Sequence, residues 1–318
     1  MIKRNRQEVY NMQYIRGMES YHDPAYTAIT LGKFDGLHRG HLKLVERVQS
    51  YAKEGLKSIV FSFDMLPFFK EKGWNKKNLM TSEEKSLFLE GKVDYLVECP
   101  FVEKVYMMEA EDFIKDILIG KFHAKHVVVG TDFRFGHQKK GDIHMLKAYE
   151  KVYGYQLDVI EKEMYGAREI SSTFIKEEME KGNIELVETL LGRPYFIAGS
   201  VKHGRALGRK LGFPTMNIAP AGEKMLPPNG VYICNVFSEG NVYAGIGNVG
   251  CRPTVSDENV TTIEAFLFDY EGQAYGQQIE VRLRKFVREE QKFSSIEELK
   301  QRVNQDIETG KQYFENVR

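Results

Sequence analysis

The pattern of apolar residues changes once along this chain, near residue 190, and that change limits the folds open to it. Before it, apolar β-branched runs such as 26–31 and 125–129 alternate with segments of helical spacing. After it, as far as residue 286, short strand-like runs follow one another between glycine-rich turns. Alternating strands and helices are typical of a parallel sheet covered by helices. Short strands without helices between them are typical of an antiparallel barrel.

The pattern therefore predicts an α/β N-terminal domain with a Rossmann-like parallel sheet and an all-β C-terminal barrel with a terminal helix. A length of 318 residues fits two domains, which we place at 1–185 and 186–318. The predicted strands are 26–31, 58–63, 95–97, 125–129 and 156–160, then 196–201, 231–236, 242–246, 263–268 and 279–283. The predicted helices are 41–51, 81–89, 109–119, 143–153, 172–181 and 184–191, with a last helix that begins after Ser295.

Charge and cysteine content exclude several classes of function. Lys plus Arg equals Asp plus Glu at 45 each, so the chain has no overall basic field to bind nucleic acid. The three cysteines are scattered, which excludes a disulfide framework and fits a reducing compartment. The N-terminal residues lack the apolar core of a signal peptide, and the apolar runs are too short to span a membrane. We expect a cytoplasmic protein without membrane or nucleic-acid partners, and a homo-oligomer is left open.

The segment that joins the first predicted strand to the first predicted helix is rich in glycine and histidine. It reads GKFDGLHRGH over residues 32–41. This is the phosphate position of an open α/β sheet, where helix N–H groups and the helix dipole favour an anion. His38 and His41 share one face of the helix start, where two imidazoles can bind phosphate oxygens. Two histidines alone would also fit a surface turn or a metal site, but the whole string favours a nucleotide.

A second glycine-rich segment opens the all-β half. Residues 199–212 read GSVKHGRALGRKLG, and backbone N–H groups and cations in such a loop can wrap a polyphosphate. Thr215 and Asn217 then alternate onto one face of a strand, where neutral oxygens suit a magnesium ion that carries phosphate ligands. Taken alone, glycines in β-turns and an exposed polar strand face are the simpler explanation.

The first half resembles the nucleotidylyltransferase superfamily, and within it the FAD synthetase half of the bacterial bifunctional riboflavin kinase/FAD synthetase family. Residues 32–41 fit the family's G-x-F-D-G-x-H-x-G-H, residues 130–136 (GTDFRFG) its G-x-D-F-R-F-G loop, and residues 170–175 (ISSTFI) its I-S-S-T-x-I helix start. The resemblance implies that ATP is bound by Gly32, Phe34, Asp35, Gly36, His38, Gly40, His41, Ser172 and Thr173, with the two histidines catalytic. It implies flavin contacts at Asp132, Phe133 and Arg134, although Phe133 fits a core position equally well.

The second half resembles the riboflavin kinase domain of the same family. Residues 199–217 fit its signature G-x-V-x-H-G-x-x-x-G-R-x-L-G-F-P-T-x-N almost in full. The resemblance implies that Thr215 and Asn217 bind the magnesium nucleotide. It also implies that Glu264 is the catalytic base, a role that suits a carboxylate beside an attacking alcohol. The implied ATP contacts are Gly204, Arg205, Gly208, Arg209, Gly212, Thr215 and Asn217, and the implied flavin contacts are Arg288, Glu290 and Phe293.

Two departures from the family pattern concern the flavin side of the first half. The family's F-x-P-H-P run is FDMLP at 63–67, which lacks the histidine, and Lys176 stands where the family has arginine. Lysine keeps the charge but not the bidentate fork.

The main interpretation is a bifunctional transferase with riboflavin, FMN, FAD and ATP, with Mg²⁺, as ligands. Its C-terminal domain phosphorylates riboflavin to FMN, and its N-terminal domain adenylylates FMN to FAD and releases pyrophosphate. The alternative is a riboflavin kinase with a degenerate or regulatory N-terminal half. A third interpretation, a flavin-responsive binding protein, would not require the base Glu264.

Overall fold

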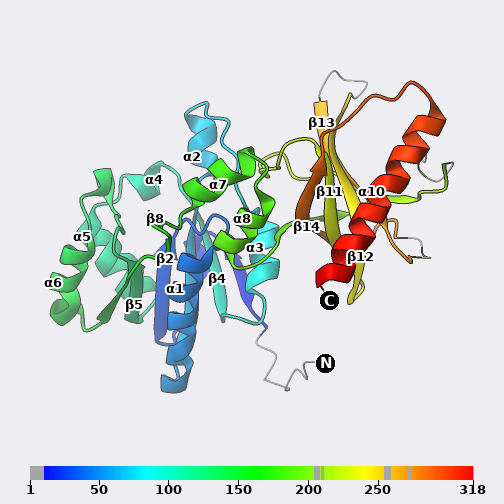
Figure 1. Ribbon diagram of the computed structural model, residues 1–318. Coiled ribbons are helices and arrows are strands. Elements are labelled where there is room, and N and C mark those ends of the chain that lie inside the picture. The colour runs from blue at the N-terminus through cyan, green and yellow to red at the C-terminus, as the bar shows by residue number, and fades with distance from the viewer. Residues whose placement is uncertain are drawn as a thin grey trace. The chain divides into compact units, whose positions relative to one another are not determined.

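The computed structural model describes residues 11–317, apart from 204–207, 209–210, 254–258, 271 and 273. The chain divides into two compact units, Met1–Ser171 and Ser172–Arg318, each of which is described by itself (Figure 1). The described helices include none that is both long enough and apolar enough to cross a membrane.

The first unit is built on a six-stranded sheet in which every pairing is parallel. In spatial order its strands are β1 (Gln13–Arg16), β4 (Tyr95–Pro100), β3 (Lys57–Asp64), β2 (Thr27–Gly32), β5 (Ala124–Gly130) and β6 (Gln156–Ile160). From β2 the chain moves outward through β3 and β4, and then returns to the other side of β2 with β5. This reversal makes the carboxyl end of β2 the topological switch point, where open α/β sheets bind their ligands.

Both faces of this sheet are buried, as a parallel sheet requires. On one face, Ile29 and Ile59 belong to the same buried cluster as Phe113 of the π-helix η3 (Phe113–Lys121). On the other face, Val60 is fully buried as well. The other helices are α1 (Arg39–Ser50), α2 (Leu66–Glu71), α3 (Ser82–Leu89), α4 (Glu103–Tyr106), α5 (Ala110–Asp112) and α6 (Ile143–Tyr153), with the short 3-10 segments η1 (Met18–Ser20), η2 (Tyr51–Glu54) and η4 (His137–Lys139).

The second unit begins with two helices, α7 (Ser172–Glu180) and α8 (Ile184–Leu191), followed by an antiparallel sheet of six strands. In spatial order the strands are β10 (Thr215–Ile218), β13 (Asn259–Leu267), β12 (Asn241–Pro253), β11 (Gly230–Ser238), β14 (Gln278–Arg288) and β9 (Tyr195–Ser200). Just after β9, Lys202 forms an isolated antiparallel bridge with Asn217 of β10, so the two edge strands of the curled sheet meet there. This arrangement confirms the predicted barrel.

Helices cover parts of this barrel. The C-terminal helix α10 (Ile296–Val317) packs against β12 and comes very close at Gly310. A Cβ atom at Gly310 would lie 2.9 Å from the ring of Phe268 and 3.1 Å from Ile246, so only glycine allows this approach. Helix α8 packs on β14, where Arg284 Nη1 lies 2.9 Å from Glu188 Oε1.

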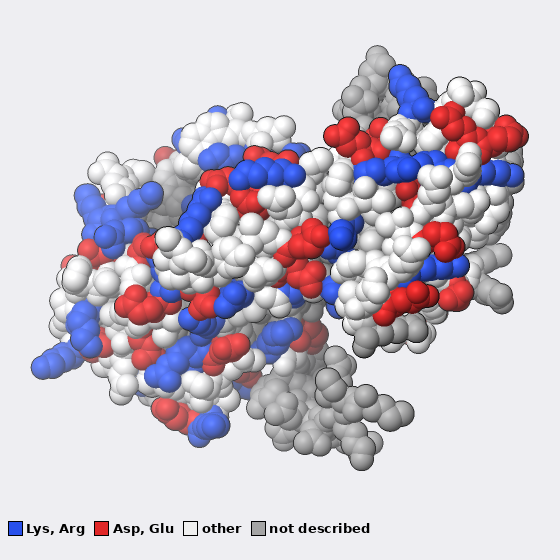
Figure 2. Space-filling view, viewed as in Figure 1, with Lys and Arg blue, Asp and Glu red and all other residues white. Residues whose placement is uncertain are grey.

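The predicted strands and helices are all present, with bounds shifted by a few residues. Thr81 and Glu84 form a capping box at the start of α3, and the N–H of Glu298 donates to Ser295 Oγ at 3.1 Å at the start of α10. The sequence did not predict the edge strand β1, the helix α2, or the hairpin of β7 (Met164–Tyr165) and β8 (Arg168–Glu169). On the face of each unit seen in Figure 2, lysines and arginines are interspersed with acidic residues.

Candidate active sites

The loop between β2 and α1 is held in an unusual backbone conformation. Phe34, Gly36 and Leu37 have positive φ angles of 46°, 85° and 42°. Such angles are unfavourable for residues with a side chain and persist only where the surroundings impose them. Here the side chains of Phe34 and Leu37 are fully buried, and Asp35 Oδ1 accepts a hydrogen bond of 2.7 Å from the N–H of Leu79. The loop is therefore fixed in shape before any ligand binds.

The two histidines of this loop stack on each other at the start of α1. Their ring centroids are 3.7 Å apart, and the planes are 22° from parallel. His38 is the N-cap residue of α1 and is buried, whereas His41 is half-buried. Gly40 fits against this pair, because a Cβ there would lie 3.3 Å from the His38 ring. The structure thus brings both predicted histidines together at the positive end of a helix and beside the switch point.

The environment of His41 favours its neutral form. Burial, and then the neighbouring His38 and Lys85, lower the pKa of His41 well below its usual value. Within the part of the chain that the structure describes, Nδ1 of His41 is buried without a hydrogen-bond partner. A neutral imidazole next to free helix N–H groups can still donate to an anion, so this end of α1 suits a phosphate.

The other residues predicted for the first site occupy neighbouring loops. Asp132 is exposed and forms an ion pair of 2.9 Å with Lys162. Phe133 is half-buried, packs against the core and stacks on Phe135 at 5.5 Å. Arg134 is exposed, with Asp142 at 3.8 Å. These three residues follow β5, next to the switch point, and their flavin contacts stay a prediction. Ser172 and Thr173 are the first two residues of α7, and their role stays a prediction too.

The second site is a row of residues across five strands of the barrel. Asn217 of β10 is paired with Glu264 of β13, and Glu264 with Asn248 of β12. Asn248 is paired with Val231 of β11, which is paired in turn with Arg288 of β14. Paired residues of neighbouring strands direct their side chains to the same face. The strand register therefore gathers these five side chains over one surface.

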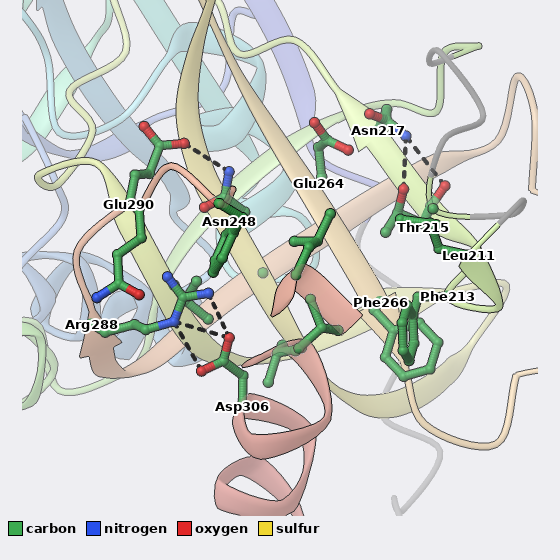
Figure 3. A pocket seen from close by; sticks show the side chains of 18 residues that line it. Leu211, Phe213, Thr215, Asn217, Asn248, Glu264, Phe266, Arg288, Glu290 and Asp306 are labelled. Carbon is green, nitrogen blue, oxygen red and sulfur yellow. Dashed lines mark hydrogen bonds and ion pairs between the residues drawn. The ribbon is translucent and has the colours of Figure 1, made fainter. Parts of the chain in front are cut away.

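A cavity of about 400 Å³ lies over this row (Figure 3). Thr215 and Asn217 lie at one side of it, Arg288 and Glu290 at the opposite side, and Glu264 between them. The apolar lining includes Phe266 and Val231, together with Leu299 and Val303 of α10. A concave, mostly apolar surface with a few convergent polar groups is typical of a small-molecule site.

The polar groups on the Arg288 side hold one another in place. Arg288 Nε lies 3.0 Å from both carboxylate oxygens of Asp306, and its Nη2 lies 2.7 Å from Oδ2. Asn248 Nδ2 donates to Glu290 Oε1 at 3.0 Å. Phe293 lies below the Arg288 guanidinium, which is 5.9 Å from the ring centroid. The guanidinium that was predicted to contact flavin is thus engaged with Asp306 of α10.

The Thr215 side of the cavity presents a hydroxyl group and a side-chain amide. Asn217 Nδ2 lies 3.3 Å from Thr215 Oγ1 and 3.2 Å from its carbonyl oxygen, which sets the orientation of the amide. The described residues contain no group of three His, Cys, Asp or Glu able to hold a metal alone. A hydroxyl and an amide oxygen beside the carboxylate of Glu264 fit Mg²⁺ whose remaining ligands come from phosphate.

The glycine-rich loop is described only in part. Phe213 N–H donates to the carbonyl of Gly208 at 2.7 Å, and a Cβ at Gly208 would lie 2.4 Å from the Phe213 oxygen. Gly208 therefore has to lack a side chain for the loop to close beside Thr215. Gly212 has a φ of 93° in the turn that follows. The predicted contacts Gly204, Arg205 and Arg209 lie outside the described residues.

Comparison with known proteins agrees with this division into two sites. A family model described as FAD synthetase matches residues 20–174, and one described as riboflavin kinase matches residues 191–314. A protein of Haemophilus influenzae named bifunctional riboflavin kinase/FMN adenylyltransferase is 35% identical over 308 residues, covering 95% of this chain and 99% of its own. The chain belongs to this family. The Escherichia coli K12 protein of the same name is 35% identical over 311 residues, and that of Pseudomonas fluorescens 32% over 300.

A solved structure also matches nearly the whole chain. It covers 94% of this chain and 98% of its own, with a TM-score of 0.83 and 26% sequence identity. That structure is described as a macrolide-efflux protein from Streptococcus pneumoniae. We take from this likeness the fold alone, because the curated members of the family, named for the two transferase activities, are more similar in sequence.

Several residues of these sites were not identified from the sequence. Asn248 and Asp306 line the cavity of the kinase-type unit, but neither was among the predicted site residues. Lys85 lies on α3, and its charge acts on His41. Lysines and acidic residues on amphipathic helices are usually exposed, so nothing in the local pattern separates Lys85 or Asp306 from their neighbours.

Proposed function

We propose that this chain makes FAD from riboflavin in two ATP-dependent steps, one in each unit. The second unit transfers the γ-phosphoryl group of ATP to riboflavin, and the first transfers the adenylyl group of a second ATP to the resulting FMN. The observation that carries the proposal is the position of Glu264, between an oxygen-rich side at Thr215 and Asn217 and a side lined by Arg288 and Glu290.

In the kinase step, the terminal hydroxyl of the ribityl chain attacks the γ-phosphorus of ATP. The bond to the β,γ-bridging oxygen breaks, ADP leaves, and Glu264 accepts the hydroxyl proton. Thr215 and Asn217 would hold a Mg²⁺ ion, which would neutralise charge on the phosphates. The apolar lining around Phe266 receives the flavin ring, with Glu290 and Phe293 at its edge. Arg288 acts through Asp306 by fixing α10 along this edge.

In the adenylyl transfer, an oxygen of the FMN phosphate attacks the α-phosphorus of ATP and pyrophosphate leaves. No general base is needed, because that phosphate is already largely ionised at neutral pH. The rigid loop of residues 33–38 and the N–H groups at the start of α1 position the ATP phosphates. The imidazoles of His38 and His41 donate hydrogen bonds to the charge that develops on the departing pyrophosphate.

The flavin side of the adenylyltransferase site differs from the family pattern at Met65, Leu66 and Lys176. Leu66 begins the short helix α2, and its N–H donates a hydrogen bond of 3.0 Å to Asp64 Oδ1. Burial, the largest influence, raises the pKa of Asp64. We expect these changes to weaken FMN binding, whereas the histidine loop keeps every residue of its motif. We assign adenylyl transfer to residues 1–185, which include α7 as well as the first unit, and phosphorylation to residues 186–318, in a cytoplasmic enzyme.

The test is to incubate the purified chain with Mg-ATP and either riboflavin or FMN, and to separate the flavins by chromatography. Riboflavin should give FMN and ADP, and FMN should give FAD and pyrophosphate. FMN without any FAD, even at high FMN concentration, would favour the alternative of a kinase with a regulatory N-terminal half. Absence of ADP formation with riboflavin would refute the kinase assignment.

A further inference from the structure

A buried ion pair lies under the histidine loop of the first unit. Lys85 of α3 and Glu98 of β4 are 5% and 3% exposed, and Lys85 Nζ lies 2.6 Å from Glu98 Oε1. The second oxygen of Glu98 accepts a hydrogen bond of 2.8 Å from the hydroxyl of Tyr14 on β1. Burial opposes the ionisation of Glu98. The charge of Lys85 and the hydrogen bonds donated to the Glu98 carboxylate outweigh burial, so the pKa of Glu98 is lowered. The carboxylate is thus held in its charged form.

This pair is connected to the loop through one hydroxyl group. Lys85 Nζ also lies 2.7 Å from Ser62 Oγ, which is itself 3.2 Å from the carbonyl oxygen of Lys33. Strand register places Ser62 between Gly32, the first residue of the loop, and Glu98. The contacts therefore run without interruption from the buried pair to the backbone of the loop that precedes His38.

Stability alone does not explain such a pair. Removing two charges from water costs several kcal/mol per ion, and well-packed apolar residues of similar volume are often as stable or more so. The pair lies at the carboxyl edge of the sheet, where parallel α/β proteins place ligands and not structural cores. Lys85 is also close enough to His41 to lower its pKa, as described above.

We propose that Lys85, Glu98 and Ser62 are positioning residues for adenylyl transfer: the buried pair orients the Ser62 hydroxyl, and Ser62 holds the Lys33 carbonyl so that the phosphate loop keeps its shape. None of the three touches substrate in this account. The inference rests on the adenylyltransferase function proposed above. It adds that contacts from β3 and α3 hold the loop in place, as well as the loop's own buried side chains.

The main test compares two serines of the same strand. Ser58 and Ser62 lie on one face of β3 and are both buried, and each contacts a carboxylate–lysine pair. Ser58 Oγ donates to Asp94 at 2.7 Å at the amino end of the strand, away from the loop. We expect Ser62→Ala to lower kcat for FAD formation at least tenfold, since small displacements of positioning groups have effects of about that size or larger. Ser58→Ala should keep kcat within about twofold.

Three further measurements distinguish a positioning role of Ser62 from a loss of fold. The KM for FMN should stay at its native value in Ser62→Ala, because the loop holds ATP. Riboflavin phosphorylation by the second unit should be unchanged in the same preparation. Trp74, the single tryptophan of the chain, lies in the first unit, so its emission reports the unfolding of that unit, and the two serine variants should unfold at similar midpoints.

A double-variant cycle tests whether Lys85 and Ser62 act as one device. Lys85→Met and Ser62→Ala combined should lower kcat about as much as the more damaging single change, because both interrupt one connection. If the kcat losses of the two single variants multiplied in the double variant, the inference would be overturned. A Ser62→Ala kcat equal to that of Ser58→Ala would overturn it too. If Lys85→Met does not fold, the serine pair alone decides. FAD formation by neither the native chain nor Ser58→Ala would refute the adenylyltransferase function itself, and this inference with it.

Discussion

The two sites differ in how far apart in the sequence their residues lie. In the first unit, ten consecutive residues supply the loop, the helix N-terminus and both histidines. In the second, the residues around the cavity come from five strands and a helix, between Gly208 and Asp306. The first site is therefore fixed mainly by local backbone geometry, and the second by the register of the barrel.

This difference has consequences for mutation. Positive φ angles at Phe34 and Leu37, with both side chains buried, restrict the loop of the first unit locally, and the contact from Ser62 adds to this restriction. The cavity of the second unit depends on distant contacts, of which the ion pair between Arg288 and Asp306 joins the barrel to α10. Damage to one long-range contact should thus disturb the second site more than the first.

The largest effect that would sharpen this comparison is expected at Asp306, which is 2% exposed. Asp306→Ala leaves the Arg288 charge, whose side chain is only 11% exposed, without its partner and should lower the free energy of unfolding of the second unit by about 3–5 kcal/mol. Arg302→Ala is the matched control: its Nε is 3.6 Å from Asp306 and its side chain is 36% exposed, so the change should be about 1 kcal/mol or less. Calorimetry would follow the second unit and Trp74 emission the first. Equal effects of the two variants would contradict the account.

Glu264→Gln should have the next largest effect, this time on chemistry. An amide of the same size keeps the fold and flavin binding but cannot accept the proton, so riboflavin phosphorylation should slow on the order of 10²-fold or more. FAD formation from added FMN serves as the internal control and should keep its native rate. Near-native kinase turnover in this variant would remove Glu264 from the catalytic role.

A smaller effect, confined to the first unit, is expected from pH. His41 has a lowered pKa in the folded chain, caused by burial, then by His38 and by Lys85 of α3. The unfolded chain, with an ordinary histidine pKa of about 6.5, takes up a proton first as the pH falls. Native stability is therefore complete above this pH and is lost below it, by at most about 1.4 kcal/mol per pH unit for one proton.

His41→Asn, which stays neutral, should remove this contribution. The Trp74 unfolding midpoint of the native chain should fall more steeply between pH 7.5 and 5.5 than that of the variant. Parallel curves would show that the folded state does not disfavour protonated His41.

The smallest effect is expected at Gly250 on β12. A Cβ there would lie 2.1 Å from Glu290 Oε1, the end of a flexible side chain, so Gly250→Ala should move Glu290 away from Asn248 with little loss of stability. We expect the KM for riboflavin to rise several-fold while kcat stays near its native value. The control is Gly222→Ala, because a Cβ at Gly222 meets no neighbouring atom within 4 Å; KM and kcat should both stay at their native values. Gly240 is unsuitable as a control because it has a positive φ. An unchanged KM in Gly250→Ala would remove Glu290 from flavin binding.

The same contrast explains what could be predicted from the sequence. The histidine string was identified because its ten residues are contiguous, and the glycine-rich signature because it too is local. The row from Asn217 to Arg288 could not be predicted, because strand register is set by packing and is not written in any one segment. Asn248 and Asp306 were missed for that reason. The guanidinium of Arg288 binds Asp306, and its predicted flavin contact stays a prediction. The strand β1 was missed because its four residues are mostly exposed and lack alternation.

The central claim is that the chain carries two separate active sites, and one crossed measurement tests it most directly. ADP formation from riboflavin and pyrophosphate formation from FMN are measured for the native chain, His41→Ala and Glu264→Gln. The account predicts that His41→Ala loses at least about 10²-fold in pyrophosphate release and keeps its kinase rate, and that Glu264→Gln does the reverse. A single variant that lost both activities while both units stayed folded would contradict two separate sites.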